Sequence, residues 1–349
     1  MKYTRNQINK SGKILLSGPD LGFPYIDANL MVEDWRKLHL LPLKELVEVV
    51  TRALSEGGVS AAFSSYRLKR MTSIIAKLKH NEQMGLGGLQ DIGGARFVFA
   101  DIPSLLRAKE IISGSTFDHF VFDRHIYDYV ACPKDSGYRS IHFAYKYISD
   151  DPDYDGLRIE LQIRTRLQHD WAMAVETAEL ISKSSLKASL GDKNWLDFFK
   201  LSSAVFARKE DMPVAASFAD YSERDFCVQY AELERKHKFL DQLQALVSAV
   251  QLGEKRDLKI GYVVILIQFD EKKVQLRHFA EDVYEMATQY YSDVEKSIND
   301  KSAAVVLVSV SDMKELQDAY PSYFLNAHEF VEALQDFNTA CKSRNYIYI

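Results

Sequence analysis

Residues 91–99 read Asp-Ile-Gly-Gly-Ala-Arg-Phe-Val-Phe, which places a carboxylate just before an apolar run. The segment Ala95–Phe99 has the β-branched and aromatic character that predicts a short strand. Gly93 and Gly94 allow the backbone to approach a ligand closely. Asp91 is therefore either a ligand of Mg²⁺, which favours one or two carboxylates together with substrate phosphates, or a turn residue that caps the local backbone.

The sequence around this strand predicts helices interleaved with further strands. The predicted helices cover 29–56, 66–80, 102–113 and 165–183, and the predicted strands cover 127–130, 140–148 and 157–163. Pro42 is expected to break the first helix in two, and Gly57-Gly58 to end it. The predicted fold is α/β, with α+β also open: a mixed central sheet of about four or five strands flanked by helices.

The last part of the chain repeats helix and strand signals on a smaller scale. Its predicted elements are a long helix over 222–252, a hairpin of 260–269 and 274–279, a helix over 280–298, a strand over 303–310 and helix up to about 341. The expected organisation is an N-terminal segment 1–28, a main domain 29–220, a connecting helix 221–252 and a smaller α/β domain 253–349. For this last domain we expect a regulatory or oligomerisation role, so a homo-oligomer or a regulatory partner is expected.

Basic residues gather in the predicted helix over 66–80. If 67–77 is helical, Ser73 and Lys77 share a face with Arg70, and Arg67 lies one turn earlier. Guanidinium and ammonium groups there suit a polyphosphate, because both offer charge-assisted hydrogen bonds. A solvated basic face is the alternative.

Two later segments carry polar groups in patterns that suit a site. The loop 133–137, Pro-Lys-Asp-Ser-Gly, ends at Tyr138, which can stack on a base. In the predicted strand, Glu160, Gln162 and Arg164 alternate with apolar residues, so their side chains share one face. That face is either part of a site or the wet side of an antiparallel sheet.

These segments together resemble the RelA/SpoT family synthetase domain, which makes alarmone nucleotides such as (p)ppGpp. The resemblance rests on four motifs in the same order: Arg67-x-Lys69-x-x-x-Ser73-Ile74-x-x-Lys77, Asp91-Ile92-x-Gly94-x-Arg96, Tyr129 with Pro133-Lys134-x-Ser136-Gly137-Tyr138-Arg139-Ser140-x-His142, and Glu160-x-Gln162-Ile163-Arg164-Thr165 with His169. It covers roughly residues 30–185. The chain therefore resembles a small, synthesis-only alarmone synthetase with an added C-terminal domain.

The resemblance implies a role for each matching residue. Arg67 and Arg96 would sandwich the adenine of ATP, while Lys69, Ser73 and Lys77 would bind its phosphates. Asp91 and Glu160 would hold Mg²⁺, and Glu160 would also take the proton of the attacking 3′-hydroxyl. Lys134, Tyr138 and His142 would bind the acceptor, with Tyr138 stacked on its base. The implied reaction transfers the β,γ-diphosphate of ATP to the ribose 3′-OH of GDP or GTP.

The sequence departs from the family at one position and leaves the acceptor open. Tyr127 stands where the family often has a cation before the Asp-Tyr pair. An adenine nucleotide or the tRNA 3′-end, acceptors of toxic relatives, therefore remain alternatives, as does a non-catalytic nucleotide-sensing protein. The His-Asp motif of an alarmone hydrolase is not found in the sequence, and His39 is interpreted as a surface or packing residue.

Composition limits the remaining function classes. A net charge of −5 disfavours a general nucleic-acid binder. The 3 cysteines are far apart, so neither a zinc site nor a disulfide is expected. We find no signal peptide or transmembrane stretch, so no membrane association and a cytoplasmic location are expected.

Overall fold

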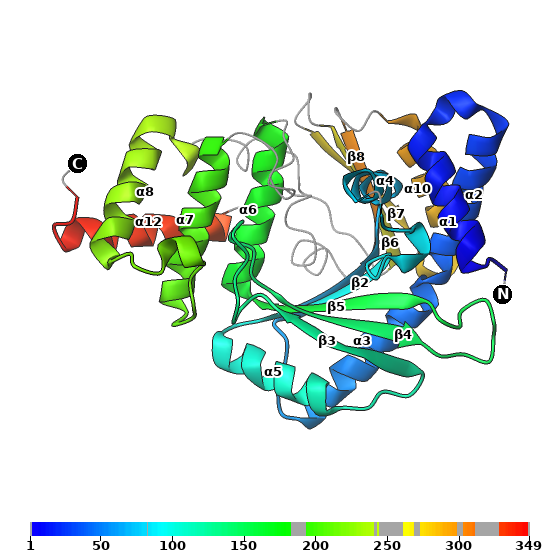
Figure 1. The fold of residues 1–349 in the computed structure, drawn as a ribbon, viewed down its shortest axis with the longest axis horizontal. Helices are drawn as coiled ribbons and strands as arrows, with labels where there is room; N and C mark the ends of the chain where they lie inside the picture. Colours follow the sequence, from blue (N-terminus) through cyan, green and yellow to red (C-terminus); the bar gives the residue numbers. More distant parts are fainter. Residues whose placement is uncertain are drawn as a thin grey trace. The chain divides into compact units, whose positions relative to one another are not determined.

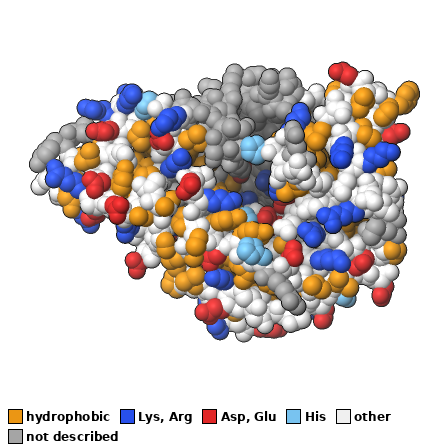
Figure 2. Space-filling view, in the orientation of Figure 1, with side chains coloured by type: hydrophobic (Ala, Val, Ile, Leu, Met, Phe, Trp, Pro, Cys, Tyr) orange, Lys and Arg blue, Asp and Glu red, His pale blue; other side chains and the backbone are white. Residues whose placement is uncertain are grey.

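The computed structural model describes residues 2–81, 83–182, 193–240, 243, 261–268, 273–298, 303–310 and 328–347. The chain divides into two compact units. The first comprises Met1–Tyr127 and Ile141–Ile163, and the second comprises Asp128–Ser140 and Arg164–Ile349. Charged side chains of both signs are interspersed over the face shown in Figure 2. None of the helices in these ranges is both long and apolar enough to cross a membrane.

A five-stranded sheet organises the first unit, and its strand order is β1-β2-β5-β4-β3. The strands are β1 (Phe63–Leu68), β2 (Gly93–Phe99), β3 (Phe120–Asp128), β4 (Ile141–Tyr147) and β5 (Arg158–Thr165). Helices α3 (Leu40–Glu56) and α5 (Ile102–Gly114) pack on one face of this sheet (Figure 1). The predicted α/β class is confirmed.

Three further helices of the first unit share a separate apolar core. They are α1 (Arg5–Ser17), α2 (Phe23–Leu38) and α4 (Met71–His80), with the short 3₁₀ turns η1 (Pro19–Leu21) and η2 (Leu86–Gly88) between elements. Helix α4 buries Met71, Ile74 and Leu78 in this core together with Trp35 of α2. The core fixes the start of α4, and with it the segment that leads from β1 into the helix.

The predicted helix over 66–80 is wrong in its first third. Residues 63–68 form β1, which pairs antiparallel with β2, and the helix begins only at Met71. The backbone N–H of Lys69 still donates to Ile92 O at 2.8 Å, which extends the ladder past the strand end. The apolar helical period begins at Met71, so the basic residues before it carried no helix signal of their own.

The predicted break at Pro42 is also misplaced. Helix α2 ends at Leu38 and α3 begins at Leu40, so Pro42 lies in the first turn of α3. Proline is tolerated there, because the first N–H groups of a helix have no intrahelical partner. The predicted helix end is confirmed, since α3 ends at Glu56 and Gly57 caps it.

Four helices build the core of the second unit. They are α6 (Arg166–Ser182), α7 (Lys193–Lys209), α8 (Glu223–His237) and α12 (His328–Ser343), with the 3₁₀ turn η4 (Ala216–Phe218) between α7 and α8. Figure 1 shows α7, α8 and α12 side by side. Trp195 and Phe198 of α7 and Phe330 of α12 are buried together in this core.

This arrangement differs from the predicted domain ranges. Because α12 shares a core with α6 and α7, its residues do not form a separate unit with the strands of 253–349. A disulfide also joins Cys227 of α8 to Cys341 of α12, so the expectation of no disulfide is wrong. The sequence offered no sign of this pair, because its cysteines are 114 residues apart. The predicted helix over 222–252 ends at His237, where Lys238 takes a left-handed conformation, and most of its second half lies outside the described residues.

A second, three-stranded sheet has the order β7-β6-β8. Its strands β6 (Gly261–Gln268), β7 (Lys273–Phe279) and β8 (Ala303–Val310) are accompanied by the 3₁₀ turn η5 (Glu281–Val283) and helix α10 (Tyr284–Ser297). The pairing of β6 with both neighbours is antiparallel, which confirms the predicted hairpin. Tyr291 of α10 is buried against Tyr262 and Phe279, so part of the aromatic stripe on this helix belongs to the core.

Candidate active site

Asp91 is the centre of a charged cluster in the first unit. Its Oδ2 accepts hydrogen bonds from Lys69 Nζ at 3.0 Å and from Lys77 Nζ at 2.8 Å. Lys69 follows β1, Lys77 lies on α4, and Asp91 precedes β2, so three consecutive elements converge on one carboxylate. Its other oxygen, Oδ1, is buried and accepts no hydrogen bond from the described residues. One oxygen of the carboxylate is thus held by two lysines, while the other is buried without a hydrogen-bond partner among the described residues.

Positive charge exceeds negative charge in this cluster. Burial alone would raise the pKa of Asp91, but the charges of Lys69 and Lys77 hold it below its usual value. The pKa of Lys69 is lowered, chiefly by burial and also by the charges of Lys77 and Arg67, while Asp91 opposes this shift. One carboxylate therefore stands among three cations, which is a balance that favours an added polyanion.

Arg67 and Arg96 lie on the same face of the sheet. In the antiparallel ladder Arg67 is opposite Gly94, and Ser65 is opposite Arg96. Directly opposed residues share a face, and so do residues two apart along a strand. The two arginines are therefore diagonal neighbours, whose Cα atoms are typically about 7–8 Å apart.

Glu160 of β5 is the second carboxylate of the first unit with a constrained position. His142 Nδ1 lies 2.9 Å from Glu160 Oε1, and Gln162 Nε2 donates to Glu160 Oε2 at 2.7 Å. Strands β4 and β5 bring these groups together, because His142 is directly opposite Gln162 in the ladder. The apolar residues between them, such as Leu161, are fully buried on the other face. The predicted polar face of this strand is therefore a set of interacting side chains.

The pKa of Glu160 is lowered as a result. Burial acts to raise it, and so does the nearby charge of Asp91, but the hydrogen bond and charge of His142 outweigh both, with help from Gln162. Glu160 is thus ionised at neutral pH. The charge of Asp91 thus acts on Glu160 and opposes its ionisation.

These two carboxylates fit a magnesium ion that arrives with its substrate. No group of three or more His, Cys, Asp or Glu side chains suited to a metal is present within the described ranges. Mg²⁺ does not need such a cage, since it is usually held by one or two carboxylates plus substrate phosphates. Asp91 Oδ1, which is buried without a hydrogen-bond partner among the described residues, is a suitable ligand atom for Mg²⁺.

The predicted shared face of the basic segment holds only in part. Ser73 and Lys77 are four residues apart on α4, as expected. Arg67 and Lys69 precede the helix, so they approach the cluster from the end of β1 instead. The positive charges of Arg67 and Lys69 are therefore carried by β1 and the segment after it, and not by a helix.

Lys134 and Tyr138 belong to the second unit. Lys134 Nζ lies 4.1 Å from the ring centre of Tyr129 and 5.4 Å from that of Tyr138. The Tyr138 ring is half-buried, 6.0 Å from the Tyr129 ring and 6.5 Å from the Trp171 ring. The loop therefore presents an aromatic face with an ammonium group beside it.

Two contacts fix this loop to helix α7. Gly137 has a φ of +89°, and a Cβ there would lie 2.9 Å from Ser203 Cβ and 3.1 Å from the Trp171 ring. The hydroxyl of Ser203 donates to Gly137 O. Only glycine fits this left-handed, closely packed position.

Glu210, just after α7, is a residue that the sequence analysis missed. Its Oε2 accepts from Arg139 at 2.6 Å and from Gln168 at 3.2 Å, and its Oε1 accepts from the Thr165 hydroxyl. Only 2% of the Arg139 side chain and 10% of the Glu210 side chain are exposed. No motif spacing links residues 139 and 210, so only the fold reveals that this ion pair anchors the loop.

Comparison with known proteins agrees with the motifs. Residues 66–185 match the family described as "Region found in RelA / SpoT proteins". An uncharacterized protein of Mycobacterium tuberculosis and one of Mycobacterium bovis are each 26% identical over 172 residues, which is 49% of this chain and 56% of the relative. Residues 66–185 thus match the region found in RelA/SpoT proteins, and the predicted resemblance is confirmed.

Comparison with solved structures returns two alarmone-related proteins at low TM-scores. Small alarmone synthetase 1 from Bacillus subtilis, bound to its product pppGpp, has a TM-score of 0.41 at 20% identity, covering 50% of this chain and 89% of that one. A GTP pyrophosphokinase family protein from Streptococcus pneumoniae has a TM-score of 0.43 at 20% identity, covering 52% and 90%. The chain spans only about half the length, 56%, of the curated relatives that it matches.

Proposed function

We propose that the protein is a nucleotide pyrophosphokinase that transfers the β,γ-diphosphate of ATP to a ribose 3′-hydroxyl, with GDP or GTP as acceptor. The observation that carries this proposal is the environment of Asp91. This carboxylate lies among three cations, its Oδ1 is buried without a hydrogen-bond partner among the described residues, and its charge acts on the pKa of Glu160. The RelA/SpoT region at 66–185 agrees with this activity.

The basic residues around Asp91 suit the donor. Lys69 and Lys77 provide charge for the ATP phosphates, and the hydroxyl of Ser73 lies on the same helix as Lys77. Arg67 and Arg96, as diagonal neighbours on one sheet face, are placed to hold a planar base between two guanidinium groups. Bound Mg²⁺ would neutralise charge on the phosphates as the diphosphate is transferred.

Transfer requires the acceptor oxygen to attack Pβ of ATP while the bond from Pβ to the α-phosphate oxygen breaks. The 3′-hydroxyl loses its proton, AMP leaves, and the acceptor gains a 3′-diphosphate. Glu160 is ionised and held by His142 and Gln162, so it can accept that proton. Positioning and electrostatics supply most of the catalysis in such transfers.

The loop of the second unit suits the acceptor. Tyr138 offers a half-buried ring for a base, and Lys134 stands next to that ring. Any base has a π-face, so the aromatic platform alone does not select guanine. In this proposal His142 serves the acceptor side through its hydrogen bond to Glu160.

The test is a transfer assay with γ-³²P-ATP and Mg²⁺, with GDP, GTP, ADP, ATP or tRNA offered separately. We expect label on GDP or GTP, with AMP released in equal amount. Label on an adenine nucleotide or tRNA alone would retain the chemistry but reject the acceptor. Glu160→Gln should abolish transfer, whereas Glu48→Gln, an exposed carboxylate on α3, should not. The proposal fails if no acceptor is labelled by the folded protein.

A further inference from the structure

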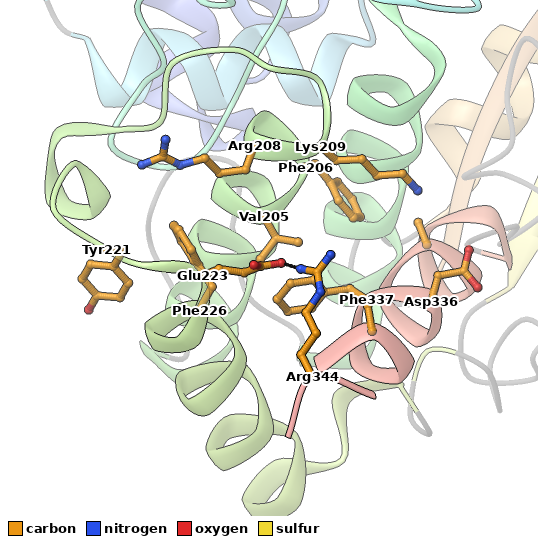
Figure 3. A pocket seen from close by; sticks show the side chains of 12 residues that line it. Val205, Phe206, Arg208, Lys209, Tyr221, Glu223, Phe226, Asp336, Phe337 and Arg344 are labelled. Atoms are coloured by element: carbon orange, nitrogen blue, oxygen red, sulfur yellow. Dashed lines mark ion pairs between the residues drawn. The ribbon is translucent and has the colours of Figure 1, made fainter. Parts of the chain in front are cut away.

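A pocket of about 630 Å³ opens in the second unit, apart from every residue assigned above to the pyrophosphokinase site. Helices α7, α8 and α12 form its walls (Figure 3). Its volume lies in the range that holds a drug-sized molecule, about 300–1,000 Å³. The pocket is large enough for a two- or three-ring ligand.

The interior of the pocket is aromatic. Phe206 and Phe226 are buried, with exposures of 0% and 3%, and Tyr221 and Phe337 are partly buried around them. The rings of Tyr221 and Phe226 lie 5.3 Å apart, and both residues line the pocket. Such walls favour a planar ring system, because aromatic rings stack or meet edge to face.

Basic side chains outnumber acidic ones around the pocket. Its lining includes Arg208, Lys209 and Arg344 against Glu223 and Asp336. Arg344 is paired with Glu223, and Figure 3 draws this ion pair across the pocket. In the part of the chain that the structure describes, Arg208 and Lys209 have no ion-pair partner. Arg208 and Lys209 at the end of α7 thus provide two positive charges, and Asp336 provides one negative charge. This balance favours an anionic ligand.

The walls are held together before any ligand arrives. Cys227, next to Phe226, is joined by the disulfide to Cys341 of α12. The ion pair of Glu223 and Arg344 joins the same two helices one turn away. A pocket fixed at two points loses little conformational entropy on binding, so it is preorganised.

We propose that this pocket is a second binding site, which takes a small aromatic anion: a planar two- or three-ring body between the aromatic walls and one negative group beside Arg208 or beside Lys209, whose side chains extend in opposite directions from the end of α7 (Figure 3). The site is independent of the pyrophosphokinase proposal, because none of its lining residues takes part in that chemistry. It contacts α7 at Val205 and Phe206, on the helix whose Ser203 holds the Tyr138 loop.

The experiment uses two fluorescent probes with the same rings and different charge. 8-Anilino-1-naphthalenesulfonate carries the anion, and N-phenyl-1-naphthylamine lacks it. With the full chain we expect one saturable site, with the sulfonate bound about tenfold more tightly than the neutral probe, as for a charge-assisted contact at a partly exposed site. Ala333→Phe, which fills the pocket, should remove this site for both probes.

A double variant tests the cations. Arg208→Gln with Lys209→Gln should reduce the affinity for the sulfonate to that for the neutral probe. The matched control is Arg235→Gln with Lys236→Gln, the corresponding exposed pair in the last turn of α8, and it should change neither affinity. Equal binding of both probes to the wild type, or saturable binding that survives Ala333→Phe with the protein folded, would overturn the proposal.

Discussion

Asp91 in the first unit and Glu210 in the second are both carboxylates among basic side chains, yet they are satisfied differently. Glu210 uses both oxygens, and its partner Arg139 is almost completely buried. Asp91 uses one oxygen, and its partners Lys69 and Lys77 retain 24% and 41% of their side-chain exposure. In the first arrangement both carboxylate oxygens have hydrogen-bond partners, whereas in the second one oxygen has none among the described residues.

This difference separates a structural ion pair from a candidate catalytic one. A buried pair is costly to break, because the remaining charge is left without water or a partner. A carboxylate with one unpartnered oxygen and partly exposed lysine partners is less costly to substitute than a fully paired, buried one. Substitution of each carboxylate should therefore affect different measurements.

The largest expected effect is on activity, at Asp91. On the proposed function, Asp91→Asn should lower kcat/KM at least about a thousandfold, or about 4 kcal/mol, because a metal ligand atom and its charge are lost. The free energy of unfolding should fall by about 1–2 kcal/mol, less than at Glu210, because Lys69 and Lys77 lose a charge partner but keep 24% and 41% of their side-chain exposure. Steady-state kinetics and urea unfolding measure the two quantities. An unfolding change as large as the activity change would mean that Asp91 is a structural residue like Glu210.

The next effect is on stability, at Glu210. Glu210→Gln should lower the free energy of unfolding by about 3 kcal/mol or more, because Arg139 is left buried without a counter-charge. The matched control is Glu223→Gln, whose pair with Arg344 is about half exposed on both sides, and it should cost less than about 1 kcal/mol. If urea unfolding gave equal losses of free energy for the two variants, burial would not determine the strength of these ion pairs.

Asp170 of α6 is a third carboxylate, and its contribution to the free energy of unfolding depends on pH. Burial and the charge of Glu329 raise the pKa of Asp170 to about 7, against the opposing charges of Arg166 and Arg164. Between about pH 4 and pH 7 the carboxyl of Asp170 is protonated in the folded state but ionised in the unfolded state. The free energy of unfolding therefore falls as pH rises through this range. Asp170→Asn should stabilise the protein by up to about 4 kcal/mol at pH 8.5 and much less at pH 5.

Thermal unfolding at the two pH values tests this effect. Asp220→Asn, at an exposed aspartate of the same unit, should give the same small change at both. If the Asp170→Asn gain were equal at pH 5 and pH 8.5, the carboxyl would not titrate in this range.

The smallest effect is expected on donor binding. Lys77→Met should raise the KM for ATP about tenfold, because one of the cations around Asp91 is lost, with a small change in kcat. Lys79→Met is the control, as an exposed lysine of the same helix. If both variants raised KM equally, general attraction of ATP to a basic helix would explain the effect, and Asp91 would not organise the donor site.

The sequence indicated which side chains gather around Asp91 and Glu160 better than it indicated the elements that carry them. Asp91 and Glu160 were identifiable because chemistry-bearing residues stood next to clear strands, and strand alternation placed Gln162 beside Glu160. Arg67 was assigned to a helix, because a short edge strand rich in serine and tyrosine has weak apolar alternation. Its identity as β1 depends on pairing with β2, a contact between residues about 30 positions apart.

Contacts between residues far apart in the chain could not be predicted from local sequence patterns. Arg139 and Glu210, like Cys227 and Cys341, meet only because the helices of the second unit pack together. Neither pair has a spacing that any local motif requires. Helix α12 likewise carries its own helical signal, but its sequence gives no indication that it shares a core with α6 and α7.

The chain passes between the two units three times, and this has a consequence for the order of synthesis. Residues 128–140 belong to the second unit but emerge from the ribosome between two strands of the first. Their supports, Trp171, Ser203 and Glu210, are translated later. The nascent sheet can therefore form while the loop with Tyr138 is still unattached, and that loop can reach its final conformation only after α7 has been made.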